Sequence, residues 1–312
     1  MKHQIRSALL VTTGLGLLLA GCGTSTIAMR EEVAQRIAAP SWMVERQIPA
    51  APFALTAYER MHERFAPADI YIEGDGLAWM TKNRKSLNPT PKNPVGLHLA
   101  SRDKAENVVW LARPCQFSGL LDDSTACDDA YWTNKRFAPE VISAYNAALD
   151  DIKKRYDIEG FNLIGFSGGG AIAALLAAQR VDVLSLRTVA GNLDHHAHSN
   201  YHNVSVLEGS LNPPDFAEKL TTMPQVHFIG GQDEVVPPAV LHSYLQALGP
   251  SNCVQYQFIH EAAHEEGWVQ KWPEFLQMTP ACSGLVQEID FTDFPSMPEP
   301  RFITKPEKPE KP

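Results

Sequence analysis

The residues best suited to covalent chemistry form a G-x-S-x-G motif at positions 165–169, with Ser167 at its centre. The motif follows an apolar run, 161–166, and opens a run of small residues, 169–180, which indicates a turn from a buried strand into a closely packed helix. A serine lifted on such a turn has strained backbone, so the residues two before and two after it must be very small. The helix N-terminus also favours a developing negative charge. This pattern predicts Ser167 as a nucleophile.

A serine hydroxyl is a weak nucleophile until a base removes its proton, so the chain must also supply a base and an acid. The chain resembles the α/β-hydrolase family, which carries its acid after a strand such as 226–231 and its base beyond the last strand, here 254–259. The resemblance implies that Asp233 is the acid and His264 the base. We expect His264 to take the serine proton and pass it to the leaving group. We expect Asp233 to hold the imidazole tautomer and to stabilise the imidazolium.

Neighbouring residues leave alternatives open for both roles. Glu234 follows Asp233 directly, and Asp194 comes after the preceding predicted strand, so either carboxylate is an alternative acid. His260, at the end of the last predicted strand, is an alternative base.

The chain order of Ser167, Asp233 and His264 resembles that of the α/β-hydrolase family, over roughly residues 50–280. The resemblance implies a mostly parallel sheet with helices on both faces and acyl transfer through an acyl-enzyme intermediate. It also implies a carboxylesterase-like activity as the default. The segment where this family inserts its cap, about 194–225, is short, which favours small or medium acyl esters over an activity that needs a large mobile lid.

The same resemblance places two backbone donors for an oxyanion. One is the N–H of Gly168, directly after the nucleophile. The second is expected from the loop after an early strand, where we assign the N–H of Asp75, with Gly76 beside it. The family often has His-Gly in this loop, so the acidic residue is a departure.

Carboxylates in that loop must be neutralised or turned away, because a negative charge facing the oxyanion would oppose it. This applies to Glu73 and Asp75, and Arg113 at the end of a neighbouring predicted strand is a candidate partner. The segment 113–117 is the rival oxyanion loop.

Short apolar runs alternate with helical patterns through the middle of the chain. This alternation predicts an α/β architecture with a mostly parallel sheet covered on both faces. The expected strands are 69–74, 107–113, 161–166, 186–191, 226–231 and 254–259, and the expected helices are 139–156, 169–180 and 237–249.

The N-terminus has the layout of a secretory signal peptide, with Lys2 and Arg6 before a short apolar run at 8–20. The residues 19–22, Leu-Ala-Gly-Cys, resemble the lipobox of bacterial lipoproteins. The resemblance implies that the Cys22 thiol is diacylated, that residues 1–21 are removed and that the new amine is acylated with a chain such as palmitate. Gly23, rather than an aspartate, favours the outer membrane.

Four cysteines remain after Cys22, and an even number in an exported chain suggests two disulfides. We favour the pairs Cys115–Cys127 and Cys253–Cys282, because each closes a short local loop.

The expected domain organisation is a signal peptide at 1–21, a tether at 22–50, a hydrolase domain at 51–290 and a disordered tail rich in proline and charge at 295–312. The formal charge of −9 becomes −11 once Lys2 and Arg6 are removed, and such an acidic chain has no basic footprint for nucleic acid.

A cluster of polar residues after one predicted strand lacks the spacing of a defined metal site, so we expect no metal and no cofactor. The cluster consists of Asp194, His195, His196, His198 and His202. The main hypothesis is therefore a membrane-anchored serine hydrolase acting on small or medium acyl esters. The alternative is an envelope binding lipoprotein that keeps the hydrolase fold without turnover.

Overall fold

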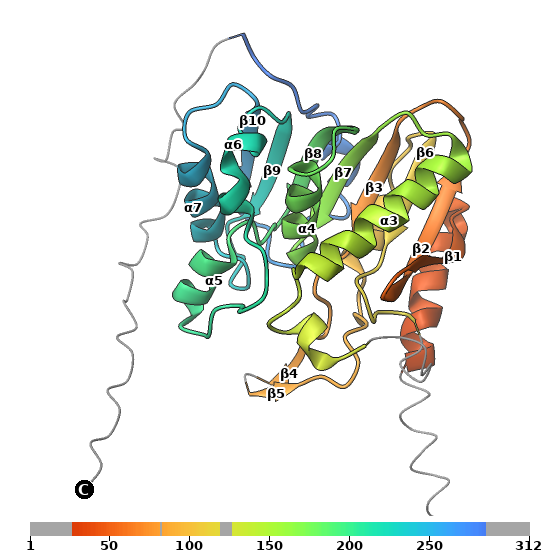
Figure 1. Cartoon of the computed structure of the whole chain (residues 1–312), viewed down its shortest axis with the longest axis horizontal. Helices are drawn as coiled ribbons and strands as arrows, with labels where there is room; N and C mark the ends of the chain where they lie inside the picture. The colour runs from red at the N-terminus through yellow and green to blue at the C-terminus, as the bar shows by residue number, and fades with distance from the viewer. Residues whose placement is uncertain (1–26, 82, 119–126, 285–312) are drawn as a thin grey trace, which may run out of the picture.

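The structure is a computed structural model that describes residues 27–81, 83–118 and 127–284. Its central element is an eight-stranded sheet in the order β1-β2-β6-β3-β7-β8-β9-β10 (Figure 1). These strands are β1 (Val44–Ala50), β2 (Phe53–Met61), β3 (Ala68–Ile72), β6 (Asn107–Leu111), β7 (Phe161–Phe166), β8 (Val183–Val189), β9 (Gln225–Gly230) and β10 (Val254–Ile259). A separate exposed hairpin consists of β4 (Trp79–Thr81) and β5 (Arg84–Lys85).

The strands from β6 to β10 in this order all run parallel, and β1 and β2 add an antiparallel edge. Every residue of β6 and of β9 is buried, as a parallel sheet covered on both faces requires. The predicted architecture is confirmed.

Helices cover both faces of the sheet. One hydrophobic cluster contains residues of α3, α4 and α7, which lie in front of the sheet in Figure 1. A second cluster joins the opposite face to the N-terminal helix at 27–38, α2 and α8. The helices are α2 (Val95–Ala100), α3 (Pro139–Tyr156), α4 (Gly168–Ala177), α5 (His195–His202), α6 (Ala217–Leu220), α7 (Pro238–Leu248) and α8 (Trp272–Phe275), with short 3-10 turns at Ala39–Ser41, Asp129–Trp132 and Pro213–Phe216.

The expected tether at 22–50 is wrong from residue 27 onward. Residues 27–38 form a helix that buries Ala34 and Ala38, and β1 pairs with β2 along its whole length. Both elements lie at the edge of the fold and bury only a narrow stripe, so their composition stays mixed and polar. The expected signal peptide, Cys22 and the tail at 295–312 lie outside the described residues.

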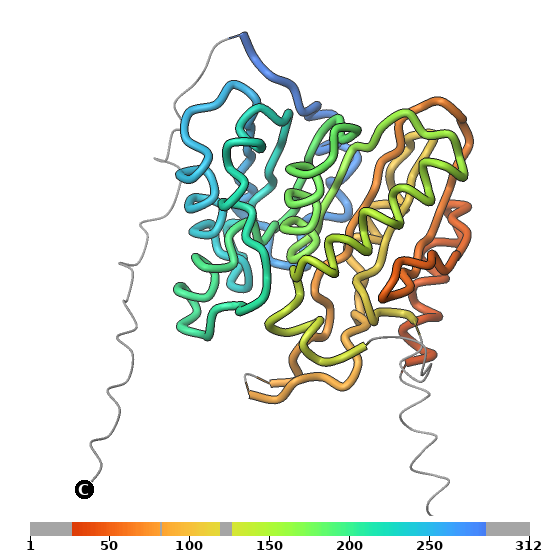
Figure 2. Tube along the Cα trace, viewed as in Figure 1, coloured from red at the N-terminus to blue at the C-terminus, as the bar shows by residue number. Residues whose placement is uncertain are grey.

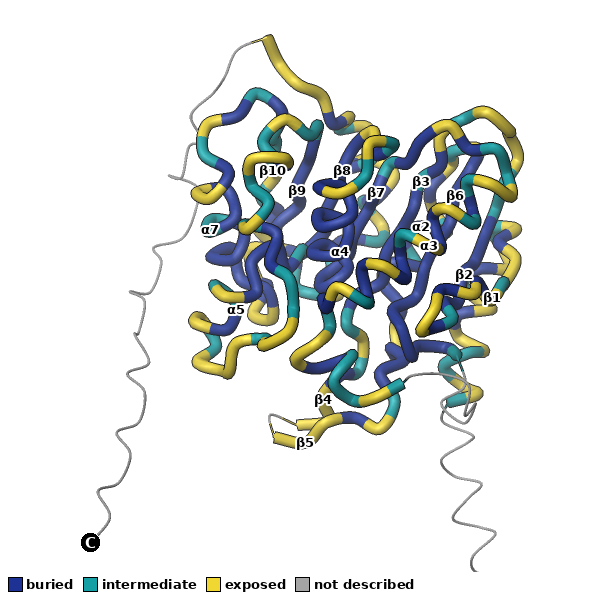
Figure 3. The backbone as a smooth tube through the Cα atoms, viewed as in Figure 1, coloured by how far each residue is buried: buried dark blue, intermediate teal, exposed yellow. Residues whose placement is uncertain are grey.

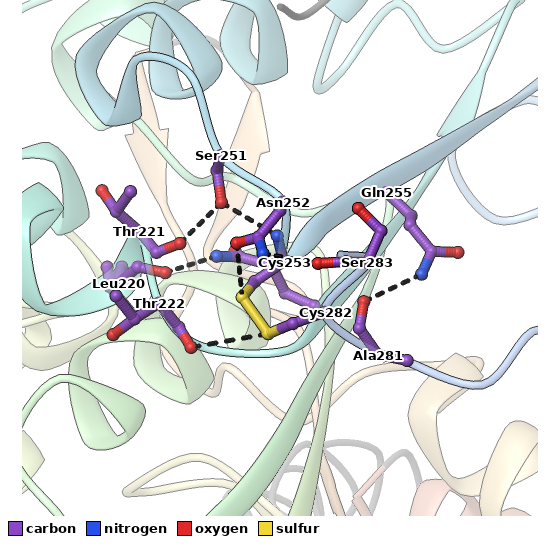
Figure 4. Close-up of a disulfide and its surroundings, with 11 residues drawn as sticks. Leu220, Thr221, Thr222, Ser251, Asn252, Cys253, Gln255, Ala281, Cys282 and Ser283 are labelled. Atoms are coloured by element: carbon purple, nitrogen blue, oxygen red, sulfur yellow. Dashed lines mark hydrogen bonds between the residues drawn. A yellow bond between two sulfur atoms is a disulfide. The ribbon is translucent and has the colours of Figure 1, made fainter. Parts of the chain in front are cut away.

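Two disulfides join the cysteines in the expected pairs, Cys115–Cys127 and Cys253–Cys282. The second fastens the segment after α8 to the start of β10 (Figure 4). Hydrogen bonds flank it, including one from Gln255 Nε2 to Ala281 O at 3.2 Å.

The carboxyl ends of the parallel strands lie at the lower edge of the molecule in Figure 2, beside the hairpin that follows β3 and the helix α5 that follows β8. Figure 3 shows buried strands above this edge and an exposed hairpin below it. Within the described ranges, no helix is both long enough and apolar enough to cross a bilayer.

Candidate active site

Ser167 lies on a tight turn between β7 and α4, with φ 52° and ψ −123°. Its neighbours must be glycine because the backbone is crowded there. A Cβ built on Gly165 would lie 2.4 Å from the carbonyl oxygen of Gly169, and one built on Gly169 would lie 2.2 Å from the carbonyl oxygen of Ile72. The serine N–H donates to Val189 O, which ties the turn to β8. The local structure therefore presents the hydroxyl at the carboxyl end of the sheet, as the motif predicts.

The structure brings Ser167, His264 and Asp233 together in one line of contacts. His264 Nε2 lies 3.0 Å from Ser167 Oγ, and His264 Nδ1 lies 2.9 Å from Asp233 Oδ2. The other carboxylate oxygen of Asp233 accepts the N–H groups of Val235 and Val236, which fixes its orientation. This geometry matches that of a base held by an acid and hydrogen-bonded to a nucleophile.

The alternative acids and base lie elsewhere. Asp194 caps α5 by accepting the N–H groups of His196 and Ala197, and it also accepts Ser243 Oγ–H. Glu234 and His260 are exposed, and the partners of the two His264 ring nitrogens are Asp233 and Ser167 instead.

The loop that follows β3 passes beside the nucleophile. A Cβ built on Gly74 would lie 3.1 Å from Ser167 Cβ, so a larger residue here would crowd the nucleophile. The first N–H groups of a helix have no partner within the helix, which leaves the Gly168 N–H available at the start of α4. Among the described residues, no hydrogen bond uses the N–H of Asp75 or Gly76. These three donors thus remain free to meet an oxyanion.

The Asp75 carboxylate is held between two arginines. Arg113 Nη1 lies 2.6 Å from Asp75 Oδ1, and Arg136 Nη1 lies 2.6 Å from Asp75 Oδ2. Burial alone would raise the pKa of Asp75, but the charges of Arg136 and Arg113 outweigh it and lower the pKa to about 2. A Cβ on Gly168 would collide with the same carboxylate. The ion pairs therefore cancel the charge of the Asp75 carboxylate and hold its loop close to the start of α4.

The sequence offers Arg113 as a candidate partner for the carboxylates of this loop, and the structure pairs it with Asp75, whereas no sequence pattern indicates Arg136. Arg136 comes from the turn before α3, about sixty residues after Asp75 in the chain, and no local pattern marks it. We call Asp75, Arg113 and Arg136 the ionic clamp.

Glu73 points away from the nucleophile into the core. Its carboxylate accepts hydrogen bonds from the Gly74 and Leu97 N–H groups and from Trp110 Nε1. Burial raises the pKa of Glu73 to about 7, against the opposing effect of these donors. Glu73 therefore ties the loop that follows β3 to the protein core, and its carboxyl group lies away from the oxyanion position.

The rival loop at 113–117 supports the first loop. The N–H groups of Arg113, Gln116 and Phe117 are already bonded, to Gln116 Oε1, Arg113 O and Thr90 Oγ1 respectively. Gln116 Nε2 also donates to Gly74 O at 3.1 Å. This arrangement favours the Asp75 loop as the source of the second oxyanion donor.

The histidines of α5 brace the loop that carries the acid. His198 Nε2 and His202 Nε2 lie 3.0 and 2.9 Å from Val235 O, two residues after Asp233. Burial lowers the pKa of His198 to about 4, so the ring is neutral near pH 7. In the part of the chain that the structure describes, no group of three or more His, Cys, Asp or Glu residues is arranged to hold a metal ion.

Comparison with known proteins finds a family that matches most of the chain. The family described as "Serine hydrolase (FSH1)" matches residues 17–265, a span that includes Ser167, Asp233 and His264. No curated protein matches the chain.

Solved structures share the fold at low sequence identity. An esterase from Pyrococcus furiosus has a TM-score of 0.53 and 13% identity, and the match covers 77% of this chain and 93% of that one. A protein from Agrobacterium tumefaciens described as "a Putative Alpha/Beta Hydrolase" has a TM-score of 0.51 and 16% identity, over 75% of this chain and 94% of that one. An acylaminoacyl peptidase from Pyrococcus horikoshii has a TM-score of 0.53 and 12% identity, over 75% and 40%. These likenesses confirm the α/β-hydrolase fold.

The ionic clamp can be tested by removing its negative charge. In Asp75→Asn, two arginines face each other without a counter-charge and the loop carrying the second donor loosens. We expect kcat on a soluble ester to fall about 10- to 100-fold, because a loosened oxyanion donor costs less than the roughly 100- to 1,000-fold loss when a donor is removed, with a smaller change in KM.

Asp182→Asn is the matched control, because Asp182 also pairs with two cations, Lys153 and Arg180, and its pKa is also lowered to about 2. It lies before β8, at the sheet edge away from Ser167, so its loss should leave kcat unchanged. Wild-type kcat in Asp75→Asn, or equal losses in both variants, would show that the clamp does not position the site.

Proposed function

The chain belongs to the FSH1 family of serine hydrolases, and from this membership we propose that it hydrolyses carboxylic esters through an acyl-enzyme intermediate on Ser167. The observation that carries the proposal is the continuous contact from Ser167 Oγ through His264 to Asp233, at 3.0 and 2.9 Å. An activated serine requires this arrangement, and a purely structural serine at a turn does not.

The proposed reaction begins when Ser167 Oγ attacks the ester carbonyl carbon. His264 Nε2 takes the hydroxyl proton, and Asp233 stabilises the resulting imidazolium through Nδ1–H. The negative charge that develops on the carbonyl oxygen is met by the N–H groups of Gly168 and Asp75. The ionic clamp holds the second of these donors and cancels the carboxylate charge beside it.

The tetrahedral intermediate then collapses to the acyl-enzyme. The bond to the alcohol breaks, and His264 returns the proton to the leaving oxygen. A water molecule repeats the sequence with His264 as base, releasing the carboxylic acid and restoring the Ser167 hydroxyl.

The substrates that we propose carry small or medium acyl groups. The segment between Asp194 and Gln225 builds only α5, a 3-10 turn and α6. Such a short segment offers no large lid to cover a long acyl chain.

We also propose that the protein is a lipoprotein of the bacterial outer membrane, acylated at Cys22. This proposal rests on the Leu-Ala-Gly-Cys sequence at 19–22 and on Gly23. Multiple acyl chains give stable anchoring, whereas a single chain gives only reversible binding.

The acyl-enzyme mechanism predicts that Ser167 and His264 act as one unit. Ser167→Ala and His264→Ala should each lower kcat by several orders of magnitude, about 10⁶-fold in the protease precedent. The double variant should be little worse than either single one, because removing the nucleophile leaves the base with nothing to activate. Kinetics with p-nitrophenyl acetate would measure this.

The acid can be assigned in the same assay by comparing Asp233→Asn with Asp194→Asn. The first should lower kcat by about 10⁴-fold, and the second should act mainly on stability through the lost cap of α5. Near-normal turnover in folded Ser167→Ala contradicts the mechanism, and a crippled Asp194→Asn beside an active Asp233→Asn contradicts the assigned acid.

The lipid anchor is tested by Cys22→Ser in cells. We expect the variant to lose its acyl mass by intact-protein mass spectrometry and to remain as a precursor or soluble form. Cys253→Ser, which removes a different cysteine, should keep the acyl mass. An unchanged mass and membrane fraction in Cys22→Ser would rule out lipidation at this residue.

A further inference from the structure

The N-terminal helix, the β4–β5 hairpin and the loop after the hairpin expose four large apolar side chains. These segments lie at the lower edge of the molecule, where the active site also lies (Figure 1). The exposed fractions of the four side chains are 64% for Met29, 40% for Trp79, 47% for Met80 and 91% for Leu87. We call this group the apolar edge. Soluble surfaces scatter such residues singly, whereas a connected group marks an interaction site.

The elements that carry the apolar edge are joined to one another. Arg30, next to Met29 on the N-terminal helix, donates to Thr90 O at 2.8 Å. The same loop pairs with the base of the hairpin, where Leu77 N donates to Pro89 O and Ser86 N donates to Ala78 O. The first turn of the N-terminal helix, the loop around Leu87 and the β4–β5 hairpin therefore form one surface.

This surface is continuous with the ionic clamp. The hairpin begins three residues after Gly76, in the loop that carries Asp75. On its other side, Trp132 Nε1 donates to Ser86 O, and Arg136 follows four residues later. The apolar edge thus borders the loops that surround Ser167.

The chain that precedes the described residues limits where a lipid anchor can be. Cys22 is five residues before residue 27, and five residues span at most about 18 Å even when fully extended. Residue 27 starts the helix turn that bears Met29, at the same edge as the hairpin. An acylated Cys22 would therefore keep this edge, and not the opposite one, close to the lipid.

We propose that the apolar edge rests on the bilayer leaflet in which Cys22 is anchored, so that the active site opens toward the membrane and takes esters from the lipid phase. The inference rests on the proposed lipidation of Cys22 and deepens the proposed hydrolase function. Tryptophan at position 79 suits the lipid–water boundary, where its ring is buried and its N–H stays hydrated.

Tryptophan fluorescence can test this orientation, since Trp79 and Trp42 mark opposite edges. Trp42 is strongly exposed and lies beside His62 and the 101–106 loop, at the amino ends of the parallel strands. The full lipoprotein would be reconstituted in phosphatidylethanolamine–phosphatidylglycerol vesicles with brominated acyl chains, which quench tryptophans near the hydrocarbon. We expect wild-type emission to be quenched, Trp79→Phe to lose that quenching and Trp42→Phe to keep it.

The proposal is overturned if Trp42→Phe, and not Trp79→Phe, loses the quenching. It is also overturned if neither substitution changes the quenching. Failure of the full chain to associate with the vesicles also overturns it. Circular dichroism and hydrolysis of p-nitrophenyl acetate would check that both variants are folded.

An activity comparison separates this inference from the hydrolase proposal. The double variant Trp79→Ser/Leu87→Ser should hydrolyse a vesicle-embedded ester with a medium-length acyl chain about tenfold more slowly, because it loses the free energy of partly burying two apolar side chains in the bilayer. It should hydrolyse soluble p-nitrophenyl acetate at the wild-type rate.

Val181→Ser, at a fully exposed valine before β8, is the matched control and should change neither rate. Equal rates on the embedded ester in all three proteins overturn the membrane-facing orientation. Absence of p-nitrophenyl acetate hydrolysis in every protein, with Trp79 still quenched, instead contradicts the proposed hydrolase activity and leaves the orientation supported.

Discussion

The strained turn at Ser167 is the constraint on which the rest of the site depends. A positive φ at a residue with a Cβ costs on the order of 1 to 3 kcal/mol, which the surrounding structure must offset. The offset comes from close backbone packing. Gly169 approaches the Ile72 carbonyl, the Ser167 N–H donates to Val189 O, and α4 is buried along its whole length. The same packing brings the loop after β3 within reach of the nucleophile.

That proximity creates an electrostatic problem, which the ionic clamp resolves. Asp75 lies beside the position where the substrate carbonyl oxygen becomes negatively charged. An unpaired Asp75 carboxylate would repel that oxyanion. Arg113 and Arg136 each bind one oxygen of the Asp75 carboxylate. The two ion pairs cancel its charge and hold together the three segments that carry these residues. Glu73 avoids the same problem differently, since its buried carboxyl accepts N–H groups on the far side of the loop.

The sequence indicated the parallel sheet because its central strands are continuous apolar runs. The predicted 161–166 and 254–259 coincide with β7 and β10, and the predicted helix 139–156 coincides with α3. The contacts of Ser167 with its expected partners were also predictable, because motif, strand ends and chain order agree. The edge elements at 27–50 were not predictable, since partial exposure hides their periodicity. The role of Arg136 is not predictable from the sequence, because its contact with Asp75 forms only when the chain folds. No local sequence pattern distinguishes Arg136 from an arginine on the protein surface.

The account centres on an activated Ser167 hydroxyl, and a fluorophosphonate probe tests this most directly. Such a probe phosphonylates a serine only when a base has activated it, with loss of fluoride. We predict one probe adduct per protein by intact-mass spectrometry, mapped to the peptide containing Ser167, and none in His264→Ala. No adduct on the folded wild-type protein, or an adduct on another serine, would contradict the account.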